Sequence, residues 1–371
     1  MIDKRLVKNL DLPLLGVVLG ITAFGILAVY SATHASMVEN GGNPYYFATK
    51  QAVGAAVGLV AMAFVINFDY RGLDKFTPYI YVGNLILLGV TLVMGKVVSG
   101  AQSWLALGPL SSFQPSEIAK IAIVITLAKH LEAKRDLQKL KGLASPFVHV
   151  GVPMALILLQ PDLGTAMVFV GILFGMLLIA GARPRHLLGI IFLFAALSPL
   201  VYFFVLKDYQ QARIMTFFNP YADSRGSGYN VIQAMIAVGS GRFFGKGLFS
   251  GTQTQLNFVP EHHTDFIFSV VGEELGFVGS ILLLSGYFFI IWRGIRTVSH
   301  ARENFGTLLA TGIISMMLFH ILINIGMNVG IMPVTGIPLP FMSFGSSSLV
   351  TNLIGIGFLL NIYMRRQKIL F

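Results

Sequence analysis

Long apolar stretches separated by short polar connections run along almost the whole chain. A helix needs about 20 mainly apolar residues to cross the hydrocarbon core of a bilayer, and ten stretches approach that length. They cover residues 12–31, 48–66, 76–95, 116–131, 146–160, 165–181, 186–205, 264–292, 305–328 and 343–364. The pattern predicts an all-α fold in which residues 1–371 form a single polytopic transmembrane domain of about ten helices.

One connection is far longer than the others. Residues 206–263 separate the seventh and eighth stretches, contain five basic residues, and include enough aromatic and aliphatic side chains to pack. A loop of this length is either functional or disordered. The sequence therefore predicts a long extracytoplasmic loop between helices seven and eight, with short helices that lie on the membrane.

The composition indicates that lipid is the solvent of this fold. Hydrophobic residues make up 55% of the chain and charged residues only 11%, with a mean hydropathy of +0.76. Soluble proteins contain about 25% charged residues, so we expect the surface of this chain to contact membrane lipids. The chain contains no cysteine, which excludes disulfide and thiolate sites.

The expected membrane topology explains the formal net charge of +10, so the charge does not indicate a surface that binds nucleic acid. When the N-terminus is placed inside, 18 of the 26 Lys and Arg residues fall on cytoplasmic connections. Positive residues favour the cytoplasmic side of a membrane, and five of the remaining eight lie in the long loop, where this rule is weak. We therefore expect both termini in the cytoplasm and no nucleic-acid partner.

Charged residues inside apolar stretches are costly and are candidates for function. The fourth stretch contains Glu117 and Lys120, which are three residues apart and share a helix face. They either form an ion pair that joins helices, or Lys120 holds a catalytic or substrate group in a cavity. Asp162 precedes the sixth stretch, where it could cap the helix, pair with Lys120, or bind substrate near the outer surface.

Asp265, at the outer mouth of the eighth stretch, is the best candidate for the centre of the chemistry. One helix face continues from it through Ser269, Gly272 and Gly276, which are all small, so another group or a substrate could approach closely. Burial or a nearby cation would shift the pKa of Asp265 and tune a general base, whereas the alternative role is an N-cap. Two adjacent histidines stand at 262–263; neighbours on a helix do not point to one metal, although a loop could bend to allow it.

A stretch rich in proline and glycine, residues 326–348, runs into the tenth helix. Irregular backbone at membrane depth persists only against protein or a water-filled cavity, so we predict a re-entrant or mouth-lining loop. Its glycine amides and its serine hydroxyls, including that of Ser343, could bind an anion such as pyrophosphate. The alternative is a plain connection between two helices.

Several long motifs are spread along the chain. They are GAQSWL at 100–105, FQPSEIAK at 113–120, QPDLGT at 160–165, GYNVIQA at 228–234, GKGLFSGTQTQLNFVPEHHTDFIFSVVGEELG at 245–276 and GMNVGIMPVTGIPLPFMSFG at 326–345. Together they resemble the SEDS (shape, elongation, division and sporulation) family of bacterial membrane proteins over essentially the whole chain. Within that family, the GTQTQLNFVPE and GIPLP segments are more similar to the elongation branch than to the division branch.

The resemblance implies a peptidoglycan glycosyltransferase of ten transmembrane helices in the bacterial cytoplasmic (inner) membrane. It would polymerise lipid II into β-1,4-linked strands at the outer face during cell elongation. Asp265 matches the essential aspartate of the family and would act as general base, while Glu117, Lys120 and Asp162 match its other polar membrane positions. The implied partners are a class B penicillin-binding protein, which supplies transpeptidase activity, and other proteins of the elongation complex.

Further residues near the mouth are predicted to bind substrate or to support its binding. They are Arg213, Lys246, Glu261, His263, Thr264 and Ser343. Undecaprenyl pyrophosphate leaves as an anion, whose charge Arg213, Arg242 or Lys246 could stabilise. No cofactor is certain from the sequence, and a divalent cation, Mg²⁺ or Mn²⁺, is an open alternative because such ions prefer oxygen ligands.

A lipid II flippase is the main alternative, because charged residues inside a helix bundle also suit a transport path. Against it, the chain contains neither paired broken helices in matching halves nor an inverted repeat. The polar positions cluster toward the outer side, which favours chemistry at one face. A protein that only scaffolds the transpeptidase would leave Asp265 unexplained.

Overall fold

Each of the ten apolar stretches forms a helix in the computed structural model, which describes residues 9–98, 101–106, 112–134, 136–204, 208–223, 226 and 228–366. These helices are α2 (Leu12–Glu39), α3 (Tyr46–Asn67), α4 (Thr77–Met94), α5 (Pro115–Glu132), α6 (Leu140–Leu159), α7 (Leu163–Ile179), α8 (Pro184–Phe204), α12 (Ile267–His300), α13 (Asn304–Asn328) and α14 (Ser346–Met364). In this part of the chain eight helices are long and apolar enough to cross a membrane, and α7 is a shorter apolar helix. The predicted polytopic helical fold is confirmed.

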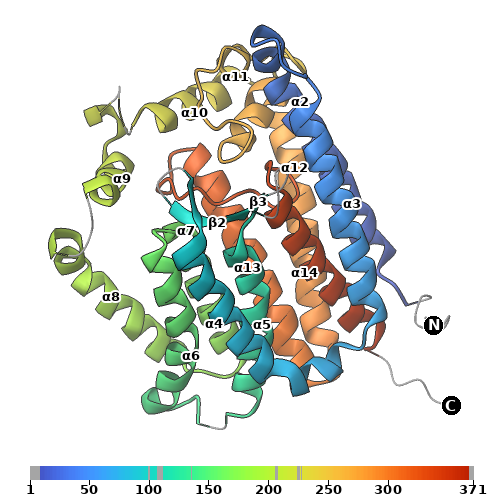
Figure 1. Ribbon diagram of the computed structural model, residues 1–371, viewed down its shortest axis with the longest axis vertical. Helices are drawn as coiled ribbons and strands as arrows, with labels where there is room; N and C mark the ends of the chain where they lie inside the picture. The colour runs from blue at the N-terminus through green and yellow to red at the C-terminus, as the bar shows by residue number, and fades with distance from the viewer. Residues whose placement is uncertain are drawn as a thin grey trace.

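The long loop folds over one end of the bundle. Its elements are α9 (Asp208–Phe218), the 3-10 helix η2 (Pro220–Asp223), α10 (Tyr229–Ser240) and α11 (Thr252–Gln255). Figure 1 shows α10 and α11 at one end, whereas α2 begins and α14 ends at the opposite end. The prediction of short helices in the loop is confirmed, and their position on a membrane stays a prediction.

Two features differ from the expected pattern. A small antiparallel sheet follows α4, with β1 (Lys96–Val98), β2 (Ala101–Ala106) and β3 (Ser112–Phe113), and it contains most of the GAQSWL motif. Helix α12 begins at Ile267 rather than at residue 264 and continues to His300. The apolar run marks the membrane core, whereas helical hydrogen bonding continues into flanking polar residues, so helix ends and apolar ends need not coincide.

The stretch between α13 and α14 is irregular and buried in protein. Ile337, Leu339 and Phe341 are almost completely buried, and the Tyr287 hydroxyl of α12 donates a hydrogen bond to the Pro340 carbonyl at 2.6 Å. A Cβ atom at Gly25 of α2 would lie 2.3 Å from the Phe341 carbonyl oxygen, so the two backbones touch. The stretch is therefore a loop packed inside the bundle and not a plain surface connection.

The small face of α12 is filled by the long loop. A Cβ atom at Gly241, which follows α10, would lie 1.9 Å from the Gly272 carbonyl oxygen. At Gly276 the helix kinks, with φ 64° and ψ −156°, and a Cβ atom there would lie 2.4 Å from the Gly245 nitrogen. The group predicted to approach this face closely is thus the protein's own backbone.

Candidate functional site

Asp265 lies in a turn, Glu261–Phe266, that leads into α12. Its carbonyl oxygen accepts hydrogen bonds from the side-chain amides of Asn324 at 2.9 Å and Asn328 at 3.1 Å, both from α13. The side-chain oxygen Oδ1 of Asn328 in turn accepts the backbone N–H of Ser269 at 2.9 Å. Phe266, and not Asp265, occupies the N-cap position of α12. The backbone of Asp265 is therefore fixed by α13, while its side chain is half-buried.

The Asp265 carboxylate faces the irregular stretch at Gly336. A Cβ atom at Gly336 would lie 3.5 Å from Asp265 Oδ2. Gly336 has a positive φ of 70°, a conformation that glycine adopts without steric cost. Glycine at this position therefore lets the loop backbone pass close to the carboxylate.

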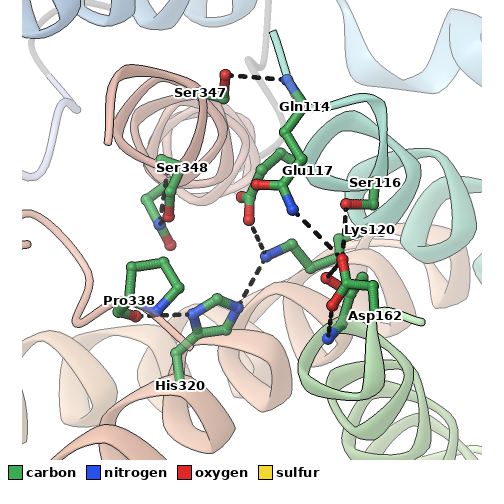
Figure 2. A network of polar contacts seen from close by, with 11 residues as sticks. Gln114, Ser116, Glu117, Lys120, Asp162, His320, Pro338, Ser347 and Ser348 are labelled. Carbon is green, nitrogen blue, oxygen red and sulfur yellow. Dashed lines mark hydrogen bonds and ion pairs between the residues drawn. The ribbon is translucent and has the colours of Figure 1, made fainter. Parts of the chain in front are cut away.

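Glu117 and Lys120 form a buried ion pair (Figure 2) and line a cavity together with Gly336. Lys120 Nζ is 2.8 Å from Glu117 Oε1, and both side chains are at most 3% exposed. The predicted i,i+3 pair is therefore present. Lys120 Nζ also lies 3.0 Å from His320 Nε2. Because an ammonium group can only donate, this nitrogen of His320 accepts.

His320 connects the ion pair to the loop. Its Nδ1 is 3.0 Å from the Pro338 carbonyl oxygen and must carry the hydrogen, since Nε2 accepts from Lys120. Sequence reasoning missed His320, although a signal was available. His320, Asn324 and Asn328 follow one another at spacings of four residues on α13, which places three polar side chains on one face of an apolar helix.

Asp162 caps the N-terminus of α7, one of the roles predicted for it from the sequence. Its Oδ1 accepts the Thr165 backbone N–H at 3.0 Å, and Oδ2 accepts the Thr165 hydroxyl at 2.8 Å. Ser116 and Gln114, at the start of α5, also donate to Oδ2, each at 3.3 Å. The alternative pair with Lys120 is not formed, because Lys120 is bonded to Glu117 and His320.

These groups enclose a small polar cavity of about 40 Å³, which has room for a few water molecules. Its walls include Gln114, Glu117, Lys120, Asp162, Thr165 and Gly336. Glu117 Oε2 is buried and accepts no hydrogen bond within the described part of the chain. The cavity therefore offers an unsatisfied carboxylate oxygen, and Gly336 in its wall also lies close to the Asp265 carboxylate.

The structure gives partners to three predicted supporting residues. Lys246 Nζ is 2.7 Å from Glu273 Oε1 of α12. The Thr264 hydroxyl lies 3.2 Å from Glu261 Oε2, to which it donates. Their roles toward substrate stay predictions, and Lys246 would have to share its charge with Glu273 to bind a phosphate.

The remaining predicted residues are Ser343, His263 and Arg213. The Ser343 hydroxyl accepts the Leu339 N–H at 2.8 Å, which braces the irregular loop. The His263 ring contacts Phe47 and Phe344, and burial lowers the pKa of His263 to about 4. The Arg213 side chain lies outside the described residues.

A metal has no ready donor set here. Among the residues that the structure describes, no three His, Cys, Asp or Glu side chains come together. The two adjacent histidines offer no shared ligand pair, because both ring nitrogens of His262 are engaged, 2.7 Å and 2.8 Å from the Val259 and Ala32 carbonyl oxygens. The described residues do not fit a divalent cation, and no chemical step is assigned to one.

Comparison with known proteins identifies the family of the chain. Residues 12–368 match the cell cycle protein family of FtsW, RodA and SpoVE. The chain belongs to this family. FtsW and RodA are SEDS proteins, so the match confirms the resemblance to the SEDS family. The chain is accordingly a multi-pass membrane protein.

Individual members of the family are similar over nearly their whole length. The chain is 37% identical over 361 residues to the peptidoglycan glycosyltransferase MrdB of Escherichia coli K12, covering 97% of the chain and 95% of MrdB. It is 36% identical over 371 residues to a probable peptidoglycan glycosyltransferase FtsW of Geobacter metallireducens, a match that covers 99% of the chain and 98% of FtsW. One chain of a solved peptidoglycan synthase complex superposes on this structure with a TM-score of 0.82 and is 33% identical in sequence. The match covers 96% of the present chain and 98% of the solved one. The chain is therefore a glycosyltransferase.

Proposed function

We propose that the chain polymerises lipid II into β-1,4-linked glycan strands at the outer face of the cytoplasmic membrane, with Asp265 as general base. One observation carries this proposal. A half-buried carboxylate, whose backbone is held by Asn324 and Asn328, lies close to Gly336, and Gly336 also lines the polar cavity. A carboxylate within hydrogen-bond reach of a substrate hydroxyl can accept its proton.

The reaction needs one proton acceptor. Asp265 takes the proton from the 4-hydroxyl of the acceptor N-acetylglucosamine, and that oxygen attacks the anomeric carbon of the donor N-acetylmuramic acid. The bond to undecaprenyl pyrophosphate breaks with inversion, and the electron pair leaves with the pyrophosphate. Because this leaving group is already a stable anion, it needs no general acid. Arg213 and Lys246 are the proposed cations for its charge.

The buried ion pair has a positioning role in this proposal. Lys120 binds Glu117 and His320, and His320 binds the Pro338 carbonyl. This chain of contacts connects α5 and α13 to the loop that places Gly336 against Asp265. The ion pair would thereby help to hold the loop close to Asp265.

The cellular setting follows from topology and from relatives. The positive-inside pattern supports a cytoplasmic position for the end where α2 begins and α14 ends, and α10, α11 and the Asp265 turn would then face outward. The similar synthase complex combines polymerisation with crosslinking, which supports a class B penicillin-binding protein as partner. The assignment to elongation rests on the GTQTQLNFVPE and GIPLP motifs, because identities of 37% to MrdB and 36% to FtsW do not separate the branches.

The test is glycan synthesis by the purified protein with its partner and labelled lipid II in detergent, where no leaflets exist and flipping is irrelevant. Wild type should make polymer, and both Asp265→Ala and Asp265→Asn should make none. Asp136→Asn, at a side chain that is 72% exposed, should match wild type. A wild type without polymer, or an Asp265 variant as active as wild type, would show that the proposed mechanism is wrong.

A further inference from the structure

A second cavity borders the turn that carries Asp265. Its volume is about 240 Å³, and it is formed by the end of α2, the start of α3 and the segment 257–263. Sites for drug-sized ligands span roughly 300–1,000 Å³. This cavity is smaller and suits a ligand of the size of a sugar ring.

Unused polar groups line this cavity. The Ser36 hydroxyl and the Asn257 amide face it, and within the described part of the chain neither side chain makes a hydrogen bond. Glu261 presents a carboxylate that the Thr264 hydroxyl orients at 3.2 Å. Phe47 adds an aromatic ring, whose electron-rich face attracts weakly polarised C–H groups. Hydrogen-bonding groups around one aromatic ring match a ligand with polar edges and apolar faces.

The charges of the residues that line the cavity further restrict the chemical class of its ligand. No lysine or arginine is among its described lining residues, and Glu261 is acidic. Burial lowers the pKa of His263 to about 4, so this ring is neutral at pH 7. Diphosphate and the carboxylates of a peptide would be repelled by Glu261. A neutral ligand with several hydroxyl groups fits this lining.

The backbone of the cavity wall is strained at two positions. Asn257 has φ 55° and Glu261 has φ 51°, a region that asparagine tolerates but glutamate adopts rarely. The Glu261 carbonyl accepts the backbone N–H groups of Thr264, Asp265 and Phe266 at 3.2, 3.0 and 3.2 Å. Strain of this kind persists where surrounding contacts enforce it, and it clusters at ligand sites. The same contacts connect Glu261 directly to Asp265.

We infer that this cavity is a sugar subsite that binds a neutral N-acetylhexosamine ring of the glycan. Ser36, Asn257 and Glu261 would bind its hydroxyl and acetamide groups, and Phe47 would contact its apolar face. The inference rests on the proposed function, since it names the part of that substrate held beside the base. A ligand seated here would contact the turn whose hydrogen bonds fix Asp265.

The experiment measures binding of N,N′-diacetylchitobiose, a neutral β-1,4-linked disaccharide, to the purified full-length protein in detergent by saturation-transfer NMR. Ser36→Ala and Asn257→Gly should each weaken binding about fivefold to tenfold, as expected for one lost hydrogen bond. Glycine keeps the positive φ at residue 257. Ser198→Ala, an exposed serine of α8, should bind like wild type, and inorganic pyrophosphate should not compete.

Absence of binding by wild type would overturn the inference, and so would unchanged binding in both cavity variants or competition by pyrophosphate. Asp265→Asn separates this result from the proposed function, because it should retain sugar binding and lose polymerisation. If Asp265→Asn polymerises lipid II while Ser36→Ala loses the sugar, the proposed base is wrong and the subsite stands. If Asp265→Asn is inactive while Ser36→Ala binds sugar like wild type, the subsite is wrong and the base stands.

Discussion

Removal of Lys120 should reveal how much the fold and the reaction each depend on the buried ion pair. At 2.8 Å and an effective dielectric constant of about 20, the attraction to Glu117 amounts to about 6 kcal/mol. Desolvation offsets much of this, but removal of one partner leaves the other charge buried. Such removal typically costs about 3–5 kcal/mol. Lys120→Met, which keeps the length of the side chain, should therefore be strongly destabilising.

The double variant Glu117→Gln/Lys120→Met separates stability from activity. It leaves no buried charge in the pair, so most of the lost free energy of unfolding should return. The Lys120 contact to His320 Nε2, at 3.0 Å, is still missing, so the ring that binds the Pro338 carbonyl is no longer held at its other nitrogen. We expect the double variant to unfold like wild type within about 1–2 kcal/mol and yet to polymerise lipid II poorly.

The assays are denaturant unfolding of the purified protein in detergent and polymerisation of labelled lipid II, both for the two single variants and the double variant. A Lys120→Met protein as stable as wild type would refute the energetic argument. A double variant that regains both stability and full activity would show that the pair is purely structural. Its proposed positioning of the loop would then be wrong.

Three further predictions concern the turn and the kink. The pKa of His263 is lowered to about 4, below the value of about 6.5 in the unfolded chain. The free energy of unfolding should therefore fall as the pH drops from about 6.5 to about 4. Thermal melts of His263→Phe should show a smaller dependence on pH over this range. Gly276→Ala should destabilise by about 2 kcal/mol or more through strain and a backbone clash, whereas Gly83→Ala, in helical backbone with open space around its Cβ, should stabilise by about 0.4–1 kcal/mol in the same melts. Asn328→Ala should lower kcat more than it raises KM, because it loosens the Asp265 backbone; an unchanged kcat would contradict this.

The sequence predicted the elements that depend on local pattern. Apolar length located the helices, and the position of Asp162 just before an apolar run indicated its role as a cap. The spacing of Glu117 and Lys120 predicted their contact, since residues three apart share a helix face. Each of these inferences needs only residues close together in the chain.

Contacts between distant segments could not be predicted in the same way. His320 is 200 residues from Lys120, and nothing in the local pattern of α13 says which helix its polar face meets. Lys246 looked like a free cation in a basic loop, whereas the fold places it against Glu273. The sheet around β2 was missed because short strands lack the length that makes an apolar run recognisable.

The packing beneath the ion pair argues against the flippase alternative. One turn further along α5 from Lys120, Ile123 and Val124 are completely buried, and Phe169 of α7 and Ile313 of α13 are completely buried as well. A Cβ atom at Gly312 would already lie 2.6 Å from a methyl group of Val124, so this apolar layer has no spare volume. A polar headgroup that crossed the bundle here would have to separate α5 from α13 and lose this packing, at about 25 cal/mol for every Å² of apolar surface exposed. A polar cavity closed below by such a layer suits chemistry at one face.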